Sequence, residues 1–461
     1  MSEKIGFVSL GCPKNQVDGE RMLAQLEDAG MEIVDALIDG ADAVIINTCC
    51  FIDSAKQESI DAVLEIAQLK EEGSVGKIIV VGCMAQKYRD DILEQLPEAD
   101  TVAGLWAVGD IVRLVRDTLA DVFDSDDAQL APLTEGDVPE GDGGSAEAPS
   151  GLPLTGKRLL TTPPHWAYLK IADGCSNNCA YCAIPSIRGA FRSVPMEDVL
   201  AETQLLVSGG ARELMLIAQD TTGYGFDLYG ELRLPQLLEE LCKISDLRWL
   251  RLLYCYPDKI TPELLAVMAH EPKIVKYIDI PLQHISDSVL SRMNRRGNSA
   301  DIRRVLNDLR TAMPNIAIRT TFITGLPGET EADFEELCEF IKEQKFERLG
   351  VFAYSPQEGT PAAEMPEQVP AEIAETRLDA LMRMQNDIVR ANAEEMTGKV
   401  IEVVCEDYDG YKDINIGRST MDAPEIDALV YFSGTADEGE FCKVKILGMS
   451  EDGYDLIGKR V

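Results

Sequence analysis

The chain of 461 residues is too long for one ordinary domain, and we expect about two to four domains. Apolar residues make up 45% and charged residues 27%, close to the globular average, which excludes a collagen-like, fully disordered or membrane-spanning chain. The formal net charge of -37 would repel a phosphate backbone and attract a strongly basic partner.

The cysteine content favours a reducing compartment. The 12 cysteines are far below the ~8–10% that marks a disulfide scaffold, and several lie in short clusters. The first ten residues lack the basic and apolar regions of a signal peptide, and no window has the ~18 uncharged apolar residues of a membrane helix. The sequence therefore predicts a cytoplasmic protein that does not contact a membrane.

Residues 3–119 are predicted to form a parallel α/β sheet domain, because short apolar runs alternate with helical patterns. The apolar runs are 5–10, 43–46 and 78–81, and the helical patterns are 21–29, 54–69 and 89–96. Residues 120–150 then carry nine acidic and no basic side chains, together with many glycines and serines. This composition predicts an acidic flexible linker over 120–160.

The same alternation resumes in residues 161–392, where six strand and helix units predict a partial (β/α)6 barrel. The expected strands are 167–171, 213–217, 249–254, 275–280, 316–323 and 349–354. Thr261 is placed to cap one helix, with Pro262 in its first turn. A long helix over 371–396 should close this domain, and Gly398 suits its end.

The last segment, 394–461, changes character and predicts a small antiparallel β-barrel. Its expected strands are 400–405, 414–418, 428–432 and 442–447, separated by turns rich in Asp and Gly.

Three cysteines just beyond the first strand of the predicted barrel carry the strongest signal. Cys175, Cys179 and Cys182 have the spacing to bind three irons of one cluster, whereas an electron-transfer cluster normally has four cysteine ligands. The next cysteine, Cys242, is distant, so one iron stays open for a substrate, as in catalytic zinc sites. Zinc itself, or three buried structural cysteines, is the alternative, but the chain has only 3 histidines to complete a zinc site.

The motif Cys175-x3-Cys179-Ala180-Tyr181-Cys182 resembles the signature of radical S-adenosylmethionine enzymes. The resemblance implies that the open iron binds the amino and carboxylate groups of S-adenosylmethionine. The segment 209–213 is similar to the glycine-rich segment that this family places near the methionine amine, although an ordinary turn explains those glycines equally well. The cofactor-binding residues that the resemblance implies are Tyr181, Gly209, Gly210, Glu213 and Arg319.

A second group of cysteines follows from the strand prediction. Cys12, Cys49 and Cys83 each come directly after an expected strand, so all three should lie at the carboxyl edge of one parallel sheet. Cysteine is a common buried residue, which is the alternative explanation for each of them. Cys50, directly after Cys49, is the alternative ligand at this position.

The residues around these cysteines resemble the three cysteine motifs of methylthiotransferases. The motifs are Leu10-Gly11-Cys12-Pro13-Lys14-Asn15, Asn47-Thr48-Cys49 and Gly82-Cys83-Met84-Ala85. The resemblance implies a cluster domain, a radical S-adenosylmethionine core and a barrel of the TRAM type at the C-terminus. It also implies two 4Fe-4S clusters: one for the radical step, with the open iron of the other holding the sulfur to be transferred. A reductant such as flavodoxin would supply electrons.

Methylthiotransferases act on an adenosine of transfer RNA, as in the MiaB type, or on an aspartate of the twelfth small-subunit ribosomal protein, as in the RimO type. Residues 398–461 carry 14 acidic and 7 basic side chains, which favours a basic ribosomal protein over transfer RNA. The segments 223–227 and 354–361 also resemble the RimO type. The basic run formed by Arg292, Arg295, Arg296, Arg303 and Arg304 is the main counter-argument. A non-catalytic iron-sulfur carrier is the alternative from another class.

Overall fold

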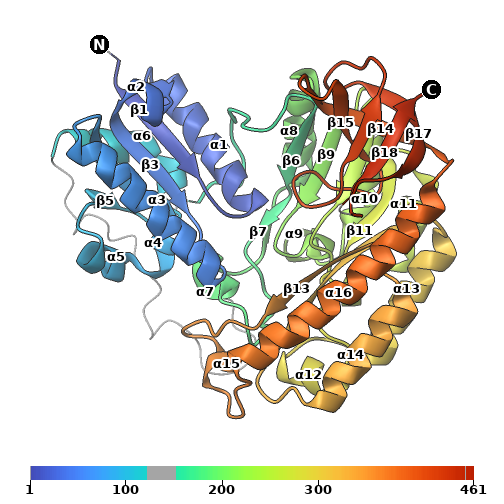
Figure 1. Ribbon diagram of the computed structural model, residues 1–461. Coiled ribbons are helices and arrows are strands. Elements are labelled where there is room, and N and C mark those ends of the chain that lie inside the picture. Colours follow the sequence, from blue (N-terminus) through green and yellow to red (C-terminus); the bar gives the residue numbers. More distant parts are fainter. Residues whose placement is uncertain (1, 122–151, 452) are drawn as a thin grey trace.

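The computed structural model describes residues 2–121, 152–451 and 453–461. Figure 1 shows an N-terminal α/β domain in blue, a larger central domain from green to orange, and a small red β-barrel packed on the central domain. In the part of the chain that is described, no helix has the length and apolar character needed to cross a bilayer. Most of the predicted acidic linker, 122–151, lies outside the described residues.

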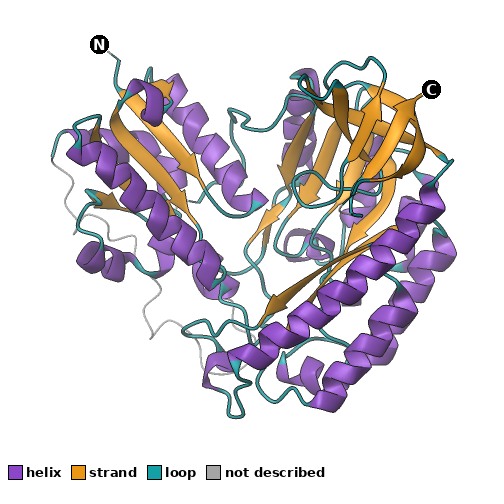
Figure 2. Cartoon of the chain, viewed as in Figure 1, coloured by secondary structure: helices purple, strands orange, loops and turns teal. Residues whose placement is uncertain are grey.

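The N-terminal domain is a five-stranded parallel sheet in the order β2-β1-β3-β4-β5, as the alternating pattern predicts. Figure 2 shows helices on both sides of its strands. The strands are β1 (Lys4–Ser9), β2 (Glu32–Val34), β3 (Ala41–Thr48), β4 (Val75–Gly82) and β5 (Thr101–Val102), and the helices are α1 (Pro13–Asp28), α2 (Ala36–Asp39), α3 (Asp53–Glu71), α4 (Cys83–Lys87), α5 (Arg89–Gln95) and α6 (Ala107–Leu119).

Helix α1 begins at Pro13, well before the expected start at residue 21. Its first turns carry polar side chains such as Lys14, Asn15 and Asp18, which give no amphipathic signal. These side chains are nevertheless buried, because the central domain covers them. The apolar periodicity therefore detects only the half of α1 that packs inside its own domain.

The central domain contains six parallel strands in the order β13-β12-β11-β10-β9-β6, which confirms the expected parallel sheet. Neighbours in the sheet are neighbours in chain order, and the end strands β6 and β13 do not pair, so the barrel is partial. The strands are β6 (Trp166–Lys170), β9 (Glu213–Ile217), β10 (Trp249–Leu252), β11 (Ile274–Asp279), β12 (Ala317–Thr324) and β13 (Arg348–Ala353). A small antiparallel pair, β7 (Ala172–Asp173) and β8 (Arg192–Ser193), flanks them.

Helices cover the outside of this sheet (Figure 1). The helices of the central domain are α7 (Ile184–Arg188), α8 (Met196–Ser208), α9 (Phe226–Tyr229), α10 (Leu234–Cys242), α11 (Pro262–His270), α12 (Asp287–Arg292), α13 (Ser299–Ala312), α14 (Glu331–Gln344), α15 (Pro361–Glu364) and α16 (Ala371–Met396). Thr261 caps α11 as predicted, because its hydroxyl accepts the Leu264 N–H at 3.2 Å. Gly398 follows α16 with φ +88°, which suits a residue without a side chain.

The C-terminal domain is a closed five-stranded barrel in the order β14-β15-β16-β18-β17. The strands are β14 (Val400–Asp409), β15 (Ile414–Ser419), β16 (Val430–Ser433), β17 (Phe441–Met449) and β18 (Leu456–Arg460). The sequence did not reveal β18, and its pairing with β16 is parallel, whereas the other pairs are antiparallel as expected.

The described end of the predicted linker, 152–160, is packed against the domains that it joins. Leu152 is 4% exposed, and the side chain of Arg158 is 3% exposed between Glu20 of α1 and Glu202 of α8. The distances from its guanidinium nitrogens to these carboxylates are 2.6 and 2.7 Å. Within the predicted linker, a buried ion pair therefore fixes Arg158 at the domain boundary.

His284, which follows β11, makes the stability of the fold sensitive to acid. Burial lowers the pKa of His284 from 6.5 to about 4, and its Nδ1 accepts the Ser286 N–H at 3.0 Å. Unfolded chains take up a proton on this ring as the pH falls below 6.5, whereas the folded protein resists protonation until about pH 4. Stability that is complete above pH 6.5 is therefore lost between these values, by about 2 kcal/mol at pH 5.

We expect the urea-unfolding midpoint to fall less between pH 7 and pH 5 in His284→Gln than in the wild type. His270 is exposed at the end of α11, so His270→Gln should keep the wild-type pH dependence. If the urea midpoint fell equally between pH 7 and pH 5 in both variants, His284 would not be the cause of the acid sensitivity.

Candidate functional site

Cys12, Cys49 and Cys83 lie at one edge of the N-terminal sheet, as predicted. They follow β1, β3 and β4, which are adjacent in the sheet, so their loops meet at its carboxyl edge. Gly11 has φ +89°, and a Cβ on it would lie 2.5 Å from the Cys49 Cβ and 2.8 Å from its Sγ. The loop that carries Cys12 therefore approaches Cys49 as closely as a glycine allows.

Polar side chains tie these loops together. The Asn15 amide donates to the Leu10 carbonyl at 2.8 Å, and the Asn47 amide donates to the Asn15 carbonyl at 2.9 Å. The Thr48 hydroxyl donates to the Val81 carbonyl of β4 at 2.5 Å. The residues beside the cysteines thus hold the three loops in one arrangement.

The thiols are close enough to affect one another's ionisation. Burial raises the pKa of Cys83 to about 12, and the charges of Cys12 and Cys49 act in the same direction. Burial also raises the pKa of Cys49, with Cys12 as the next cause. For Cys12, burial is outweighed by the cations Lys14 and Arg188, so its pKa is lowered. Three mutually interacting thiols with nearby cations can hold a cluster that carries negative charge.

Cys175, Cys179 and Cys182 lie together in the loop between β7 and α7. The Cys175 N–H donates to the Gly189 carbonyl at 3.1 Å, and the Ala180 N–H donates to the Met293 carbonyl at 2.9 Å. Asn177 donates to Asp220, which follows β9, at 2.6 Å. Segments from distant parts of the central domain therefore hold the loop at the carboxyl edge of the six-stranded sheet.

The second set of thiols also interact with one another. Burial raises the pKa of Cys175 to about 11 and that of Cys182 to about 12, and the charges of neighbouring thiolates contribute to both shifts.

Aromatic side chains and a half-buried arginine lie around Cys179. The Tyr256 hydroxyl lies 3.6 Å from the Cys179 Sγ, and the Arg295 guanidinium lies 4.0 Å from the Tyr256 ring centroid. Tyr181 is half-buried, and its pKa is raised by desolvation despite the opposing charge of Arg295. The predicted cofactor residue Tyr181 therefore does lie at this cysteine loop.

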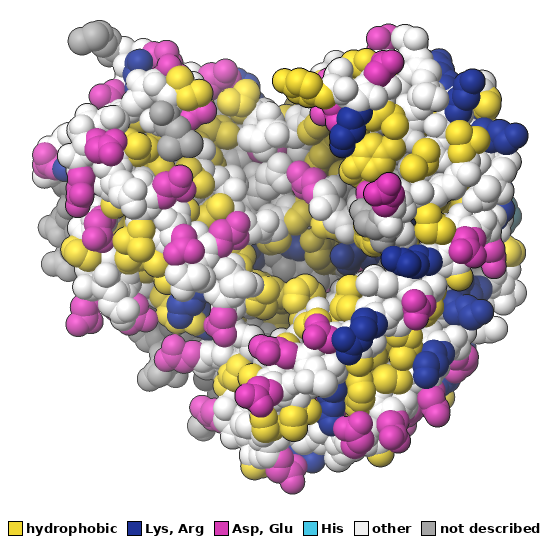
Figure 3. Space-filling model, viewed as in Figure 1, with side chains coloured by type: hydrophobic (Ala, Val, Ile, Leu, Met, Phe, Trp, Pro, Cys, Tyr) yellow, Lys and Arg dark blue, Asp and Glu magenta, His cyan; other side chains and the backbone are white. Residues whose placement is uncertain are grey.

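The two cysteine sets lie on either side of one contact between domains. Arg188, the last residue of α7, places its Nη2 3.4 Å from the Cys83 Sγ. The Lys14 ammonium lies 3.2 Å from the Tyr254 ring centroid, just past β10. Figure 3 shows a hollow between the N-terminal lobe and the rest of the molecule. Both sets therefore face the boundary between the two domains.

Gly209, Gly210 and Glu213 lie elsewhere, and their predicted cofactor role is not supported. They are at the start of β9, whereas the cysteine loops lie beyond the ends of the strands, at the opposite edge of the sheet. Glu213 is 1% exposed and accepts from Arg251 at 2.9 Å and from Arg418 at 2.5 Å. Its carboxylate therefore fixes the C-terminal barrel to the sheet.

Arg319, the remaining predicted cofactor residue, is paired with two carboxylates. Its guanidinium lies 3.5 Å from Asp279 of β11 and 3.4 Å from Asp427 of the C-terminal domain. A contact with S-adenosylmethionine stays a prediction for this residue.

The donor sets fit clusters better than a mononuclear metal. Within the described ranges, no three His, Cys, Asp or Glu side chains converge at the geometry of a single metal ion. A four-iron cluster spreads its thiolate ligands over different irons, so it does not need three side chains to converge on one ion.

Two amide oxygens at the cysteine-bearing edge fit donor groups of S-adenosylmethionine. Gln219 Oε1, beyond β9, and Gln283 Oε1, beyond β11, are buried and have no hydrogen-bond partner among the described residues. Gln283 also has φ +71°, a backbone conformation that is costly for a residue with a side chain. Such oxygens can accept from the amino group or the ribose hydroxyls of the cofactor.

The sequence did not identify Arg188, Lys14, Arg295 or Tyr256 as site residues. Their contacts join residues that are distant along the chain, so no periodic pattern marks them. The available signal was their position: Lys14 stands within the Cys12 motif, and Arg188 follows Cys182 closely.

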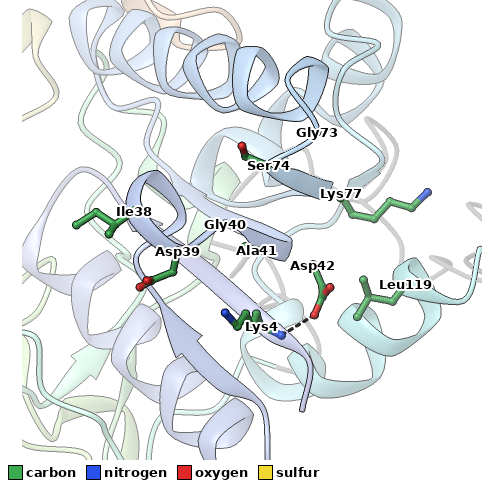
Figure 4. Close-up of a pocket in the computed structure, with 11 residues that line it drawn as sticks. Lys4, Ile38, Asp39, Gly40, Ala41, Asp42, Gly73, Ser74, Lys77 and Leu119 are labelled. Atoms are coloured by element: carbon green, nitrogen blue, oxygen red, sulfur yellow. Dashed lines mark hydrogen bonds between the residues drawn. The ribbon is translucent and has the colours of Figure 1, made fainter. Parts of the chain in front are cut away.

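A separate cavity of about 700 Å³ opens at the amino edge of the N-terminal sheet (Figure 4). Its walls include Lys4, Asp42, Ser74 and Lys77 and no cysteine. It lies at the starts of β1, β3 and β4, so it is not part of the cysteine-bearing edge.

We expect Gly11→Ala to lower the iron bound per chain after anaerobic reconstitution to about half, because its methyl group would displace Cys49. Gly30 has a similar φ of +84° and no atom within 4 Å of an added Cβ, so Gly30→Ala carries the same backbone strain without the contact. Unchanged iron in Gly11→Ala, measured beside Gly30→Ala, would rule out this role for Gly11.

Family models match three parts of the chain in the expected order. Residues 4–104 match the uncharacterized protein family UPF0004, 169–341 match the radical SAM superfamily, and 397–461 match the TRAM domain. Among solved structures, the radical S-adenosylmethionine methyltransferase TsrM from Kitasatospora setae is similar in fold, with a TM-score of 0.55 at 16% identity over 78% of this chain and 75% of that chain.

Curated relatives match over the full length. The ribosomal protein uS12 methylthiotransferase RimO of Desulforamulus reducens is 47% identical over 99% of both chains. The RimO proteins of Geobacter sulfurreducens and Lachnoclostridium phytofermentans are 46% and 44% identical, over 99% of this chain and 98% and 99% of their own. With its cysteine motifs at the carboxyl edges of two parallel sheets, the chain belongs to the RimO family of radical S-adenosylmethionine methylthiotransferases.

Proposed function

We propose that this transferase adds a methylthio group to the β-carbon of an aspartate in ribosomal protein uS12, with two 4Fe-4S clusters and S-adenosylmethionine. The radical SAM match implies one such cluster and the cofactor. The observation that supports the second cluster is the contact between Arg188 and Cys83, because it places a second open cysteine set against the domain that holds the first.

Each of the two cysteine sets would hold one of the two clusters. Cys175, Cys179 and Cys182 would hold one cluster, and Cys12, Cys49 and Cys83 would hold the other. When bound, S-adenosylmethionine supplies two things: the radical that removes hydrogen from an unactivated carbon, and the methyl group that is transferred. Tyr256 and Arg295 would shield Cys179 from water, and Lys14 packs on Tyr254 at the domain boundary.

The surface charge favours a basic protein substrate. Figure 3 shows Asp and Glu side chains spread over the N-terminal domain. The basic run that argued for transfer RNA is largely neutralised: Arg292 pairs with Glu367 at 3.1 Å, Arg304 pairs with Asp301 at 3.0 Å, and Arg303 pairs with Glu343. Arg295 is half-buried against the Tyr256 ring, whereas Arg296 is exposed.

Acidic side chains outnumber basic ones by 14 to 7 in residues 398–461, and four of the basic ones pair with carboxylates. Among its basic residues, Arg418 is buried against Glu213, and Arg460 pairs with Glu440 at 2.5 Å. Lys443 and Lys412 lie 3.6 Å from Glu402 and Asp409. Lys399, Lys445 and Lys459 are exposed, so it is the excess of acidic side chains that disfavours binding to phosphates.

We expect the two cysteine sets to bind iron independently. The wild-type chain should bind about eight irons, and replacing either set by alanine should leave about four. The Cys175→Ala, Cys179→Ala, Cys182→Ala variant should form no 5'-deoxyadenosine, because the cofactor has lost its iron. The matched control is Cys338→Ala, a cysteine of α14 outside both sets, which should keep all the iron.

A chain that bound about four irons in the wild type would contradict the second cluster. Cluster-loaded protein that left S-adenosylmethionine intact under reducing conditions would favour the iron-sulfur carrier.

The substrate is tested by mass spectrometry of purified uS12 after incubation with the reduced, reconstituted enzyme. We expect one methylthio group on one aspartate, in an amount that falls as salt is raised, because opposite charges bring the partners together. A transfer RNA that carries the MiaB-type adenosine should remain unmodified in the same reaction. Modification of that RNA with unmodified uS12 would reverse the assignment.

A further inference from the structure

Arg188 holds a position that neither the motifs nor the family match assigns. Its side chain is 1% exposed and lies between the N-terminal domain and the cysteine loop of the central domain. Nη1 donates to Asp18 of α1 and to Asp173 of β7, both at 2.9 Å. Nη2 lies 3.4 Å from the Asn15 Oδ1 and 3.4 Å from the Cys83 Sγ. One guanidinium thus contacts both domains and one cysteine sulfur.

The charges around Arg188 are balanced without the sulfur. Lys170 contributes a second cation, which lies 2.7 Å from Asp173 and also pairs with Asp18. Arg21 lies 3.9 Å from Asp18, and both Arg21 and Arg158 pair with Glu202. With Glu20, the other partner of Arg158, four cations and four carboxylates are enclosed together. One N–H of the Arg188 Nη2 points to Cys83, and this hydrogen bond becomes charge-assisted when the sulfur carries negative charge. A thiolate that binds iron carries such charge.

The orientation of this donor is fixed from the central domain. Arg188 ends α7, and the next residue, Gly189, accepts the N–H of Cys175. Asp173, which holds Nη1, stands two residues before Cys175. The loop that carries the radical-site cysteines thus also fixes the donor that reaches the other cysteine set.

We propose that Arg188 is a positioning residue for the N-terminal cluster and that its charge-assisted hydrogen bond to Cys83 makes this cluster easier to reduce. Hydrogen bonds to cysteine sulfur and local positive charge are known determinants of iron-sulfur potentials, because they stabilise the added electron. The inference rests on the proposed function, since it requires Cys83 to be a cluster ligand.

The test uses the full chain with Cys175, Cys179 and Cys182 replaced by alanine, so that only the N-terminal cluster is present. Its midpoint potential is measured by EPR during titration with dithionite. Arg188→Lys keeps the positive charge beside Asp18 and Asp173 but is too short and too narrow to reach Cys83 as well. We expect the cluster to be harder to reduce by about tenfold, which is about 59 mV for a one-electron couple.

Arg158→Lys is the matched control. Arg158 is also a buried arginine that joins the two domains through carboxylates, but it contacts no cysteine. Its substitution should leave the potential unchanged. Equal shifts in the two variants would show that domain docking sets the potential, and an unchanged potential in Arg188→Lys would exclude the sulfur contact. Either result overturns the inference while leaving the proposed function intact.

A second measurement does not depend on the variant retaining its cluster. In the same cysteine background with Arg188 intact, growth on ¹⁵N-arginine should give a weak ¹⁵N coupling to the reduced cluster in pulsed EPR. A cluster without this coupling contradicts the inference. Failure of any cluster to form in this background contradicts the proposed function itself, and the inference with it.

Discussion

The geometry of the site depends on one enclosed group of charges between the N-terminal and central domains. Asp18 and Asp173 lie between Lys170 and Arg188, and all four side chains are at most 1% exposed. The two cations lower the pKa of Asp173 against the opposing effect of burial, so its carboxylate stays charged. Removing one member would strand a buried charge, at a cost of about 3–5 kcal/mol.

An apolar contact of the same size would bind the two domains as well, but it would specify their relative position less strictly. Each carboxylate accepts from both cations, and the donors point along fixed directions. This matters for a reaction in which two clusters and a substrate carbon must meet, because small displacements of reacting groups reduce rates strongly. The polar boundary thus fixes the orientation of the catalytic parts.

The same use of buried ion pairs attaches the C-terminal barrel. Arg251 and Arg418 both contact Glu213, and Arg348 pairs with Asp422. These contacts lie at the amino edge of the central sheet, so the barrel is attached away from the cysteine loops. The central domain therefore keeps its two edges separate: one holds the accessory barrel, and the other faces the cluster domain.

The sequence by itself determined the order of the domains, the two parallel sheets, the C-terminal barrel and the cysteines that lie at the sheet edges. Those features follow from local patterns: apolar runs predict strands, and a cysteine directly after a parallel strand must lie at its carboxyl edge. The strand positions grouped Cys12, Cys49 and Cys83, and the motifs around them distinguished Cys49 from Cys50.

Only the tertiary structure decided which polar residues serve the site. Gly209, Gly210 and Glu213 lie at the amino edge of the central sheet, opposite to the cysteine loops. The sequence could not show this, because a glycine turn before a strand has the same sequence pattern at either edge. The structure also assigns Arg188, Asp18 and Lys170 to the site. From the sequence, these charged residues are expected at the surface, whereas the two domains enclose them. Pairing across domains leaves no periodic trace along the chain, because each partner is fixed by how the domains pack and not by its neighbours in sequence.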